Sequence, residues 1–159
     1  MKQARTFVAI AAVLAAFSVL PGCRRGGSTA ASSGSDMPVS SHAGSTMHWE
    51  NGWKQALNRA QHENKAVLVD FYADWCVWCR RLDTTTYRDP AVLAYVNSNL
   101  VPVKLNVDAR DGQALARQYG VDGLPTIVIL GANGKEMGRI PGYLPADRFL
   151  DAVRHFVGS

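Results

Sequence analysis

The chain has 159 residues, of which 47% are apolar and 19% charged. This length allows one domain of ordinary size plus a tail, and the composition excludes a wholly disordered, a collagen-like or a multi-span membrane protein. The net charge is +4, and without Lys2 and Arg5, in a segment that we expect to be removed, 15 basic residues face 13 acidic ones, an excess of +2. So small a charge gives no reason to expect a nucleic-acid partner. Three cysteines, Cys23, Cys76 and Cys79, are too few for a small fold held together by disulfides.

The first 22 residues predict a signal peptide. The two basic residues precede positions 7–20, a run of 14 residues that is apolar apart from one serine. This run is short for a membrane span and typical of a secretory signal, and it lacks the polar face and cap of a core helix. The following Leu20-Pro21-Gly22-Cys23 resembles the processing site of bacterial lipoproteins. The resemblance implies cleavage before Cys23 and acylation of this cysteine, which would anchor the protein to a membrane.

A tether is expected to follow. Of the 23 residues from 24 to 46, 17 are Gly, Ser, Thr, Ala or Pro, so the segment cannot bury enough apolar area to offset its ordering entropy. A flexible coil of this length reaches roughly 25–30 Å. We therefore divide the chain into a signal peptide at 1–22, the lipidated cysteine and tether at 23–47, and one folded domain at 48–159.

Helix and strand patterns alternate along the folded part. Apolar spacing predicts a first helix from about 51 to 64, with Trp49 and Trp53 as its core contacts. A β-rich run at 65–72 follows, with one acidic residue inside it, and then a helix beginning near Cys76. Asp89-Pro90 is a strong helix start, because Asp suits the N-cap and Pro the first helical position.

The second half continues the alternation. In chain order, we expect a strand at 101–107, a short helix from 111 to near 120, a strand at 126–130, a hairpin turn at 133–134, a strand at 135–140 and a closing helix at 145–157. Strands separated by helices favour parallel pairing, and the hairpin adds an antiparallel edge. The pattern therefore predicts an α/β domain.

A Cys-x-x-Cys motif directly follows the first predicted strand. With Cys76 at the first helical turn, Cys79 lies one turn on and on the same face, where the two sulfurs can bond. The helix N-terminus stabilises a thiolate, so we expect Cys76 to be the exposed attacking sulfur and Cys79 the resolving one. A structural zinc site would need two further ligands, and a static disulfide across so short a loop would stabilise little. We therefore interpret the motif as a redox pair.

The chain from about 66 to 157 resembles thioredoxin. The matching stretches, in order, are Val69-Asp70-Phe71-Tyr72-Ala73-Asp74-Trp75-Cys76 with Cys79, Lys104-Leu105-Asn106-Val107-Asp108, Tyr119-Gly120-Val121, Gly123-Leu124-Pro125-Thr126, and Gly142 before the closing helix. Within the superfamily, the stretch 72–77 and Asp89-Pro90 resemble the C-terminal domain of DsbD-type disulfide reductases. The resemblance implies a thioredoxin fold, with a central mixed β-sheet flanked by helices on both faces. Val77-Trp78 replaces the Gly-Pro of thioredoxin between the cysteines, so the direction of electron flow is not carried over.

The resemblance also implies roles for residues around the cysteines. Asp70 is expected to be buried behind them with Lys104 nearby, where desolvation raises the pKa of the carboxyl and Lys104 lowers it. Such a carboxylate can take or give the proton of Cys79, whereas the alternative is an Asp that faces water on an edge strand. Pro125 is expected to be the family's cis-proline. The residues expected to form an apolar contact surface for an extended partner segment are Trp75, Trp78, Leu124, Pro125 and Gly142, with Trp78 the most exposed.

We therefore predict a monomeric thiol–disulfide oxidoreductase, lipid-anchored on the periplasmic side of a bacterial cell envelope. It would reduce protein disulfides, take electrons from a membrane thiol relay and need neither an organic cofactor nor a metal. Two alternatives stay open: a disulfide oxidase or isomerase, and a non-catalytic thioredoxin-fold binding module or copper-handling chaperone.

Overall fold

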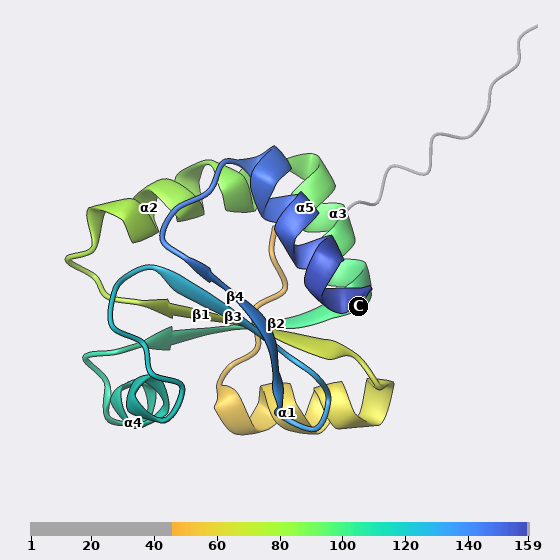
Figure 1. The fold of residues 1–159 in the computed structure, drawn as a ribbon, viewed down its shortest axis with the longest axis horizontal. Helices are drawn as coiled ribbons and strands as arrows, with labels where there is room; N and C mark the ends of the chain where they lie inside the picture. Colours follow the sequence, from red (N-terminus) through yellow and green to blue (C-terminus); the bar gives the residue numbers. More distant parts are fainter. Residues whose placement is uncertain (1–45, 159) are drawn as a thin grey trace, which may run out of the picture. The chain divides into compact units, whose positions relative to one another are not determined.

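The computed structural model describes residues 46–158. Its elements, in chain order, are α1 (Trp53–Glu63), β1 (Ala66–Tyr72), α2 (Val77–Thr84), the short 3₁₀ helix η1 (Thr86–Arg88), α3 (Pro90–Asn99), β2 (Leu100–Asn106), α4 (Arg110–Gln118), β3 (Thr126–Leu130), β4 (Glu136–Pro141) and α5 (Ala146–Val157) (Figure 1). The sequence of helices and strands is the predicted one, with η1 added. The predicted signal peptide, Cys23 and nearly all of the tether lie outside the described residues.

The four strands form one mixed sheet in the order β2-β1-β3-β4. β1 pairs with β2 in parallel and with β3 antiparallel, and β3 pairs antiparallel with β4. The predicted thioredoxin fold with a mixed central sheet is confirmed. We expected antiparallel pairing only at the hairpin edge. The structure shows it between β1 and β3 as well, because β3 inserts beside β1 instead of extending the parallel pair.

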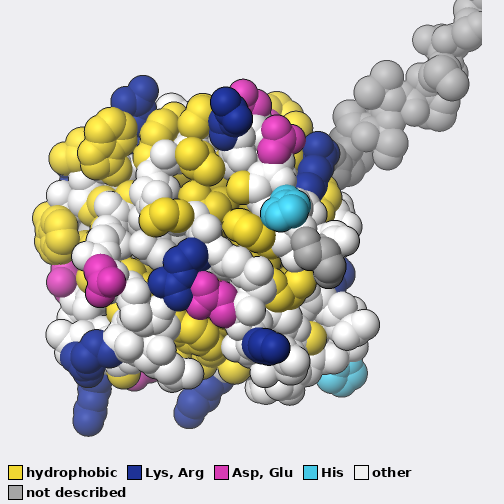
Figure 2. Space-filling view, viewed as in Figure 1, with side chains coloured by type: hydrophobic (Ala, Val, Ile, Leu, Met, Phe, Trp, Pro, Cys, Tyr) yellow, Lys and Arg dark blue, Asp and Glu magenta, His cyan; other side chains and the backbone are white. Residues whose placement is uncertain are grey.

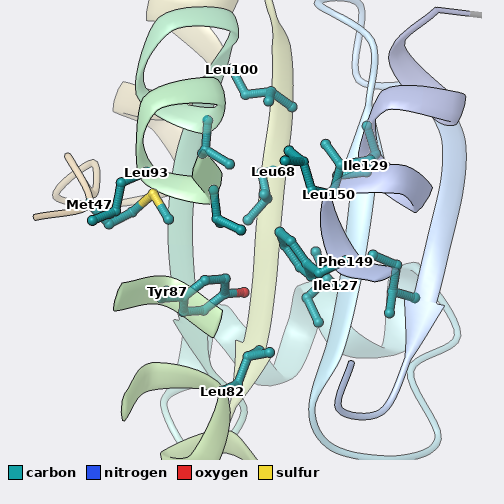
Figure 3. Close-up of a cluster of buried hydrophobic side chains, with 14 residues drawn as sticks. Met47, Leu68, Leu82, Tyr87, Leu93, Leu100, Ile127, Ile129, Phe149 and Leu150 are labelled. Carbon is teal, nitrogen blue, oxygen red and sulfur yellow. The ribbon is translucent and has the colours of Figure 1, made fainter. Parts of the chain in front are cut away.

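Helices cover both faces of the sheet. In Figure 1, α2, α3 and α5 lie above it and α1 and α4 below it. Alternate residues of β1 point to opposite faces, so Leu68 packs in the cluster under α2, α3 and α5, whereas Val67 and Val69 pack against α1 and α4. Figure 3 shows the first cluster, in which Leu82 of α2 and Phe149 of α5 meet the sheet. β1 is covered on both faces, which explains its almost continuous apolar sequence.

Local sequence sets several boundaries. Asp89 is the N-cap of α3, and its Oδ1 accepts hydrogen bonds from the backbone N–H groups of Ala91 at 2.8 Å and Val92 at 3.1 Å.

The first helix begins at Trp53, two residues later than predicted. Trp49 therefore lies outside it, and the two tryptophans pack on opposite faces of the sheet instead of side by side.

The segment Thr46 to Glu50 meets α3 through Asn97 and then the outer edge of β2 through Glu50. Glu50 forms a parallel bridge with Val103, and its N–H donates to the carbonyl of Pro102 at 2.8 Å. Met47, assigned to the tether by the sequence, is 8% exposed and packs in the core. This segment covers part of an edge that would otherwise present unpaired backbone groups.

Candidate active site

The two cysteines of the motif form a disulfide at the start of α2. Their Cα atoms are 5.3 Å apart. Cys76 is the N-cap of the helix, and its Sγ accepts a hydrogen bond from the N–H of Cys79 at 3.1 Å. In the reduced protein this N–H and the helix N-terminus would stabilise a thiolate at Cys76. Cys76 is 5% exposed and Cys79 2%, so both cysteines are buried, and Cys76 is less exposed than we expected.

An apolar surface surrounds the disulfide. Trp75 is 67% exposed and Trp78 51%, so the more exposed of the two is Trp75 and not, as predicted, Trp78. Val77, which the sequence did not single out, is also exposed. Hydrophobic side chains gather on the face of Figure 2 over the end where Figure 1 places α2. Large exposed apolar residues around a reactive group favour docking of a protein segment.

A groove of about 280 Å³ lies beside this surface, and four of the five predicted contact residues line it. It is lined by Trp78, Leu124, Pro125, Gly142 and Tyr143. The Leu124–Pro125 peptide bond is cis, and the N–H of Gly142 donates to the carbonyl of Pro125 at 2.7 Å. Gly142 has a φ of 91°, a backbone conformation that favours glycine.

Tyr143 is a groove residue that the sequence analysis missed. Its ring lies 5.8 Å from that of Trp78, and the guanidinium of Arg81 lies 5.3 Å from the centre of the Trp78 ring and 4.9 Å from that of Tyr143. One wall of the groove is therefore aromatic and carries a cation. Its position directly after Gly142 was the available signal.

Trp75 lies outside the groove and is oriented by a polar contact. Its indole N–H donates to Oδ2 of Asp108 at 2.9 Å. Asp74, its neighbour, accepts from the side-chain amide of Asn106 at 3.3 Å and from Arg80 through its backbone carbonyl at 2.8 Å. The loop before Cys76 is thus tied to the end of β2, with the ring of Trp75 left open to a partner.

A buried carboxylate lies on the face of β1 that α2 covers, two residues after Leu68, which packs in the same cluster as Leu82 of α2. Asp70 is 1% exposed on β1, an inner strand, so the edge-strand alternative is wrong. It pairs in register with Lys104 of β2, whose Nζ lies 3.5 Å from Oδ2 of Asp70. Burial raises the pKa of Asp70 from 3.8 to about 7, although the charge of Lys104 opposes this and a second carboxylate, Asp83, adds to it.

Asp83 is a further residue that the sequence analysis missed. It lies on α2 four residues after Cys79, hence on the same helix face, and its Oδ1 is 2.5 Å from Nζ of Lys104. Lys104 therefore joins an acid of β1 to an acid of α2. The i, i+4 spacing was visible in the sequence, but the contact depends on how α2 crosses the sheet.

Aromatic rings surround the same ammonium group. Nζ of Lys104 lies 4.6 Å from the ring centre of Tyr72, 5.4 Å from that of Trp49 and 5.9 Å from that of Tyr87. A cavity of about 330 Å³ borders this cluster and is lined by Thr46, Met47, Trp49, Asp83, Tyr87, Arg88 and Lys104. The segment Thr46 to Glu50 thus helps to enclose the charged cluster of Asp70, Asp83 and Lys104.

Residues 46–158 show neither a metal-binding cluster nor a membrane-spanning helix. This part of the chain contains no cluster of three or more His, Cys, Asp or Glu side chains placed to hold a metal ion. Nor does any of its helices have the length and apolar character needed to cross a membrane.

Comparison with known proteins agrees with this geometry. The thioredoxin-like domain family matches residues 53–156. The thiol:disulfide interchange protein DsbD of Photorhabdus laumondii is 34% identical over 110 residues, which cover 66% of this chain and 19% of that protein. The chain thus spans about a fifth of the length of this relative.

Solved structures give the same result. A thioredoxin from Thermus thermophilus superposes with a TM-score of 0.64 at 33% identity, covering 69% of this chain and 86% of that one. The oxidised C-terminal domain of DsbD from Neisseria meningitidis superposes with a TM-score of 0.56 at 28% identity, covering 64% and 90%. With its disulfide at the N-terminus of α2, the chain belongs to the thioredoxin-like family and is a thiol–disulfide oxidoreductase.

Proposed function

We propose that this protein reduces disulfides of other proteins outside the cytoplasm. The observation that carries the proposal is the Cys76–Cys79 disulfide at a helix N-terminus, next to an exposed aromatic surface. A protein substrate needs such a surface, because the attacked disulfide has to be held in line with Cys76. The similarity to DsbD supports the extracytoplasmic location, and the reducing direction is the part of the proposal that a measured reduction potential tests.

The reaction is an exchange of disulfide bonds. In the reduced enzyme, the thiolate of Cys76 attacks one sulfur of the partner disulfide, and the other partner sulfur leaves as a thiolate that takes up a proton. Cys79 then loses its proton, attacks the sulfur of Cys76 and breaks the mixed disulfide, so the second partner sulfur leaves. The partner gains two electrons, and the enzyme ends with the Cys76–Cys79 disulfide.

Asp70 is the proposed acceptor of the Cys79 proton. Its pKa of about 7 lets it exist in both forms near neutral pH, as a general base requires. Lys104 compensates its charge when the proton leaves. In this proposal Trp75, Trp78, Leu124, Pro125 and Gly142 hold an extended partner segment.

The surroundings of the enzyme complete the proposal. A membrane thiol relay, itself oxidised to a disulfide, would return two electrons to the Cys76–Cys79 pair, as the similarity to DsbD supports. Acyl chains on Cys23 would anchor the monomeric protein to the membrane, with the tether carrying the domain on its periplasmic side. Labelled fatty acid should enter the chain but not a Cys23→Ala variant; label in that variant would contradict the anchor.

The reduction potential of the Cys76–Cys79 pair, measured against a glutathione or dithiothreitol series, tests the direction of electron flow. A value near or below about −270 mV, that of thioredoxin, is expected for a reductase. A value near about −120 mV would make the protein an oxidant.

A trapping experiment tests the roles of the two sulfurs. Cys79→Ser should accumulate a mixed disulfide between Cys76 and a partner, visible by mass spectrometry under non-reducing conditions. Cys76→Ser should accumulate none and should not reduce insulin. Partner binding by the double variant, together with no insulin reduction by the unaltered protein, would point instead to a binding module.

A further inference from the structure

The hydroxyl group of Tyr87 is a buried donor that the mechanism has not used. Tyr87 lies in η1 and is 4% exposed. Its ring packs edge-on against Trp49, with centres 5.2 Å apart, and against Phe149 at 5.6 Å. Figure 3 shows its oxygen pointing towards β1, the strand that carries Asp70. Among residues 46–158, nothing forms a hydrogen bond with this hydroxyl.

A second buried polar atom faces the same space. Oδ1 of Asp70 also has no hydrogen-bond partner within residues 46–158, whereas Oδ2 lies 3.5 Å from Nζ of Lys104. The same ammonium lies 5.9 Å from the ring centre of Tyr87, so it borders both groups. Each group acts on the other, because the hydroxyl lowers the pKa of Asp70 and the carboxylate raises that of Tyr87.

The two atoms are complementary. Buried polar atoms without a partner are strongly unfavourable, and each would satisfy the other if the O–H were directed at Oδ1. A small rotation or one bridging water completes the contact. Burial, followed by the charges of Asp70 and Asp83, raises the pKa of Tyr87 well above its ordinary value. The hydroxyl therefore keeps its proton and acts as a donor throughout the working pH range.

We propose that Tyr87 is a positioning residue of the exchange reaction, whose hydroxyl donates to Oδ1 of Asp70, directly or through one water, and holds this carboxylate ionised and aimed to accept the Cys79 proton. The inference rests on the proton-accepting role of Asp70 in the proposed function. Tyr87 supplies a neutral donor to one oxygen, and Lys104 supplies a charge to the other.

Three elements packed around the carboxylate supply its charged and titratable neighbours. The groups that face Asp70 are Lys104 from β2, Asp83 from α2 and Tyr87 from η1, and Arg88 of η1 borders the adjoining cavity. Lys104 is shared with Asp83 at 2.5 Å, so its charge is not devoted to Asp70 alone. The hydroxyl of Tyr87 adds its own favourable contribution to ionisation of Asp70, beside the larger effects of burial, Lys104 and Asp83.

Tyr87→Phe in the otherwise unaltered protein tests the inference. The substitution removes one oxygen and keeps the ring contacts with Trp49 and Phe149. Two quantities are measured: the pKa of Asp70 by carboxyl ¹³C NMR, assigned with Asp70→Asn, and the pH profile of mixed-disulfide resolution. We expect the pKa to rise so that the ratio of ionised to protonated Asp70 falls about tenfold at a given pH, and the rate profile to move by about one pH unit to alkaline pH.

Tyr95→Phe is the matched control. Tyr95 packs against the same core cluster, but its ring faces the guanidinium of Arg154 at 5.1 Å. Removing its hydroxyl should leave both the pKa of Asp70 and the rate profile unchanged. An equal change in both variants would show a general packing effect and overturn the role of the Tyr87 hydroxyl.

The remaining outcomes separate the inference from the proposed function. An unchanged pKa of Asp70 in Tyr87→Phe overturns the inference and leaves the role of Asp70 intact. A raised pKa with a rate profile that neither Tyr87→Phe nor Asp70→Asn alters overturns the proton-accepting role and the positioning role with it. A measurement on the unaltered protein needs no variant: the ring ¹³C signal of Tyr87 should titrate together with Asp70, and a flat signal would contradict the contact.

Discussion

Replacing Asp70 by Asn should change how the stability of the oxidised protein depends on pH. The buried carboxyl has a pKa of about 7 in the folded protein, against 3.8 as its ordinary value. Between these values the folded state binds a proton that the unfolded state has lost, so the free energy of unfolding falls as pH rises. About 3 pH units at about 1.4 kcal/mol each give a loss of roughly 4 kcal/mol, complete above pH 7.

Asn cannot ionise, so the variant should lack this loss. As pH rises from 4 to 8, the free energy of unfolding of the variant, relative to that of the unaltered protein, should therefore increase by roughly 4 kcal/mol. Lys104 keeps Asp83 as a partner at 2.5 Å, so the substitution does not strand a buried cation. Denaturant unfolding at several pH values, followed by circular dichroism, measures the difference, and Asp151→Asn on the exposed face of α5 is the control. A stability difference that stays constant from pH 4 to pH 8 would refute the reasoning.

Two further substitutions test the contact surface and the packing of α4. Trp78→Ala should lower kcat/KM towards a protein disulfide about tenfold and leave the reaction with dithiothreitol unchanged, because only a protein uses the groove. The control is Met137→Ala, since Met137 is exposed on β4. An equal loss in both variants would contradict a docking role. Gly112→Ala should destabilise the fold by about 2 kcal/mol or more, since its Cβ would lie 2.0 Å from a backbone oxygen of β2. Gly134→Ala, strained by a φ of 78° but in open space, should cost about 1 kcal/mol in thermal unfolding, and an equal loss in both variants would argue against the close approach.

The proposals for Asp70 and Tyr87 concern the step that frees the partner. Mixed disulfides are resolved only when the second sulfur becomes a thiolate. Cys79 is 2% exposed, so water has little access to its proton. In these proposals Asp70, a buried base with a pKa near neutral pH, is the acceptor of this proton, and the groups around it set the fraction of the carboxyl that is ionised.

The surface around Cys76 complements this interior. Its groove has an aromatic wall in which the guanidinium of Arg81 lies over the rings of Trp78 and Tyr143. Aromatic side chains offer a partner a large apolar area with little conformational freedom to lose. Such a wall suits the proposed capture of an extended segment.

Local pattern was sufficient for the secondary structure and for the reactive pair. Asp89-Pro90 marked the start of α3 because a cap and a fixed φ act within one turn of the chain. The spacing of Cys76 and Cys79 predicted a disulfide because helical geometry brings residues three apart to one face. The first helix was placed too early because Trp49 continues its apolar spacing, although its ring packs on the other face of the sheet.

Contacts between distant segments were decided only in the tertiary structure. The sequence placed Asp70 on a strand, and the resemblance placed Lys104 beside it, but Asp83 and Tyr87 join them only because α2 and η1 cross the sheet at this point. The position of β3 beside β1 likewise follows from packing, since the strand sequence fits either neighbour. Periodicity and capping act over a few residues and can be read in order along the chain. The surroundings of a buried charge depend on which faces of the helices and the sheet are in contact, and the packing of the whole core determines those contacts.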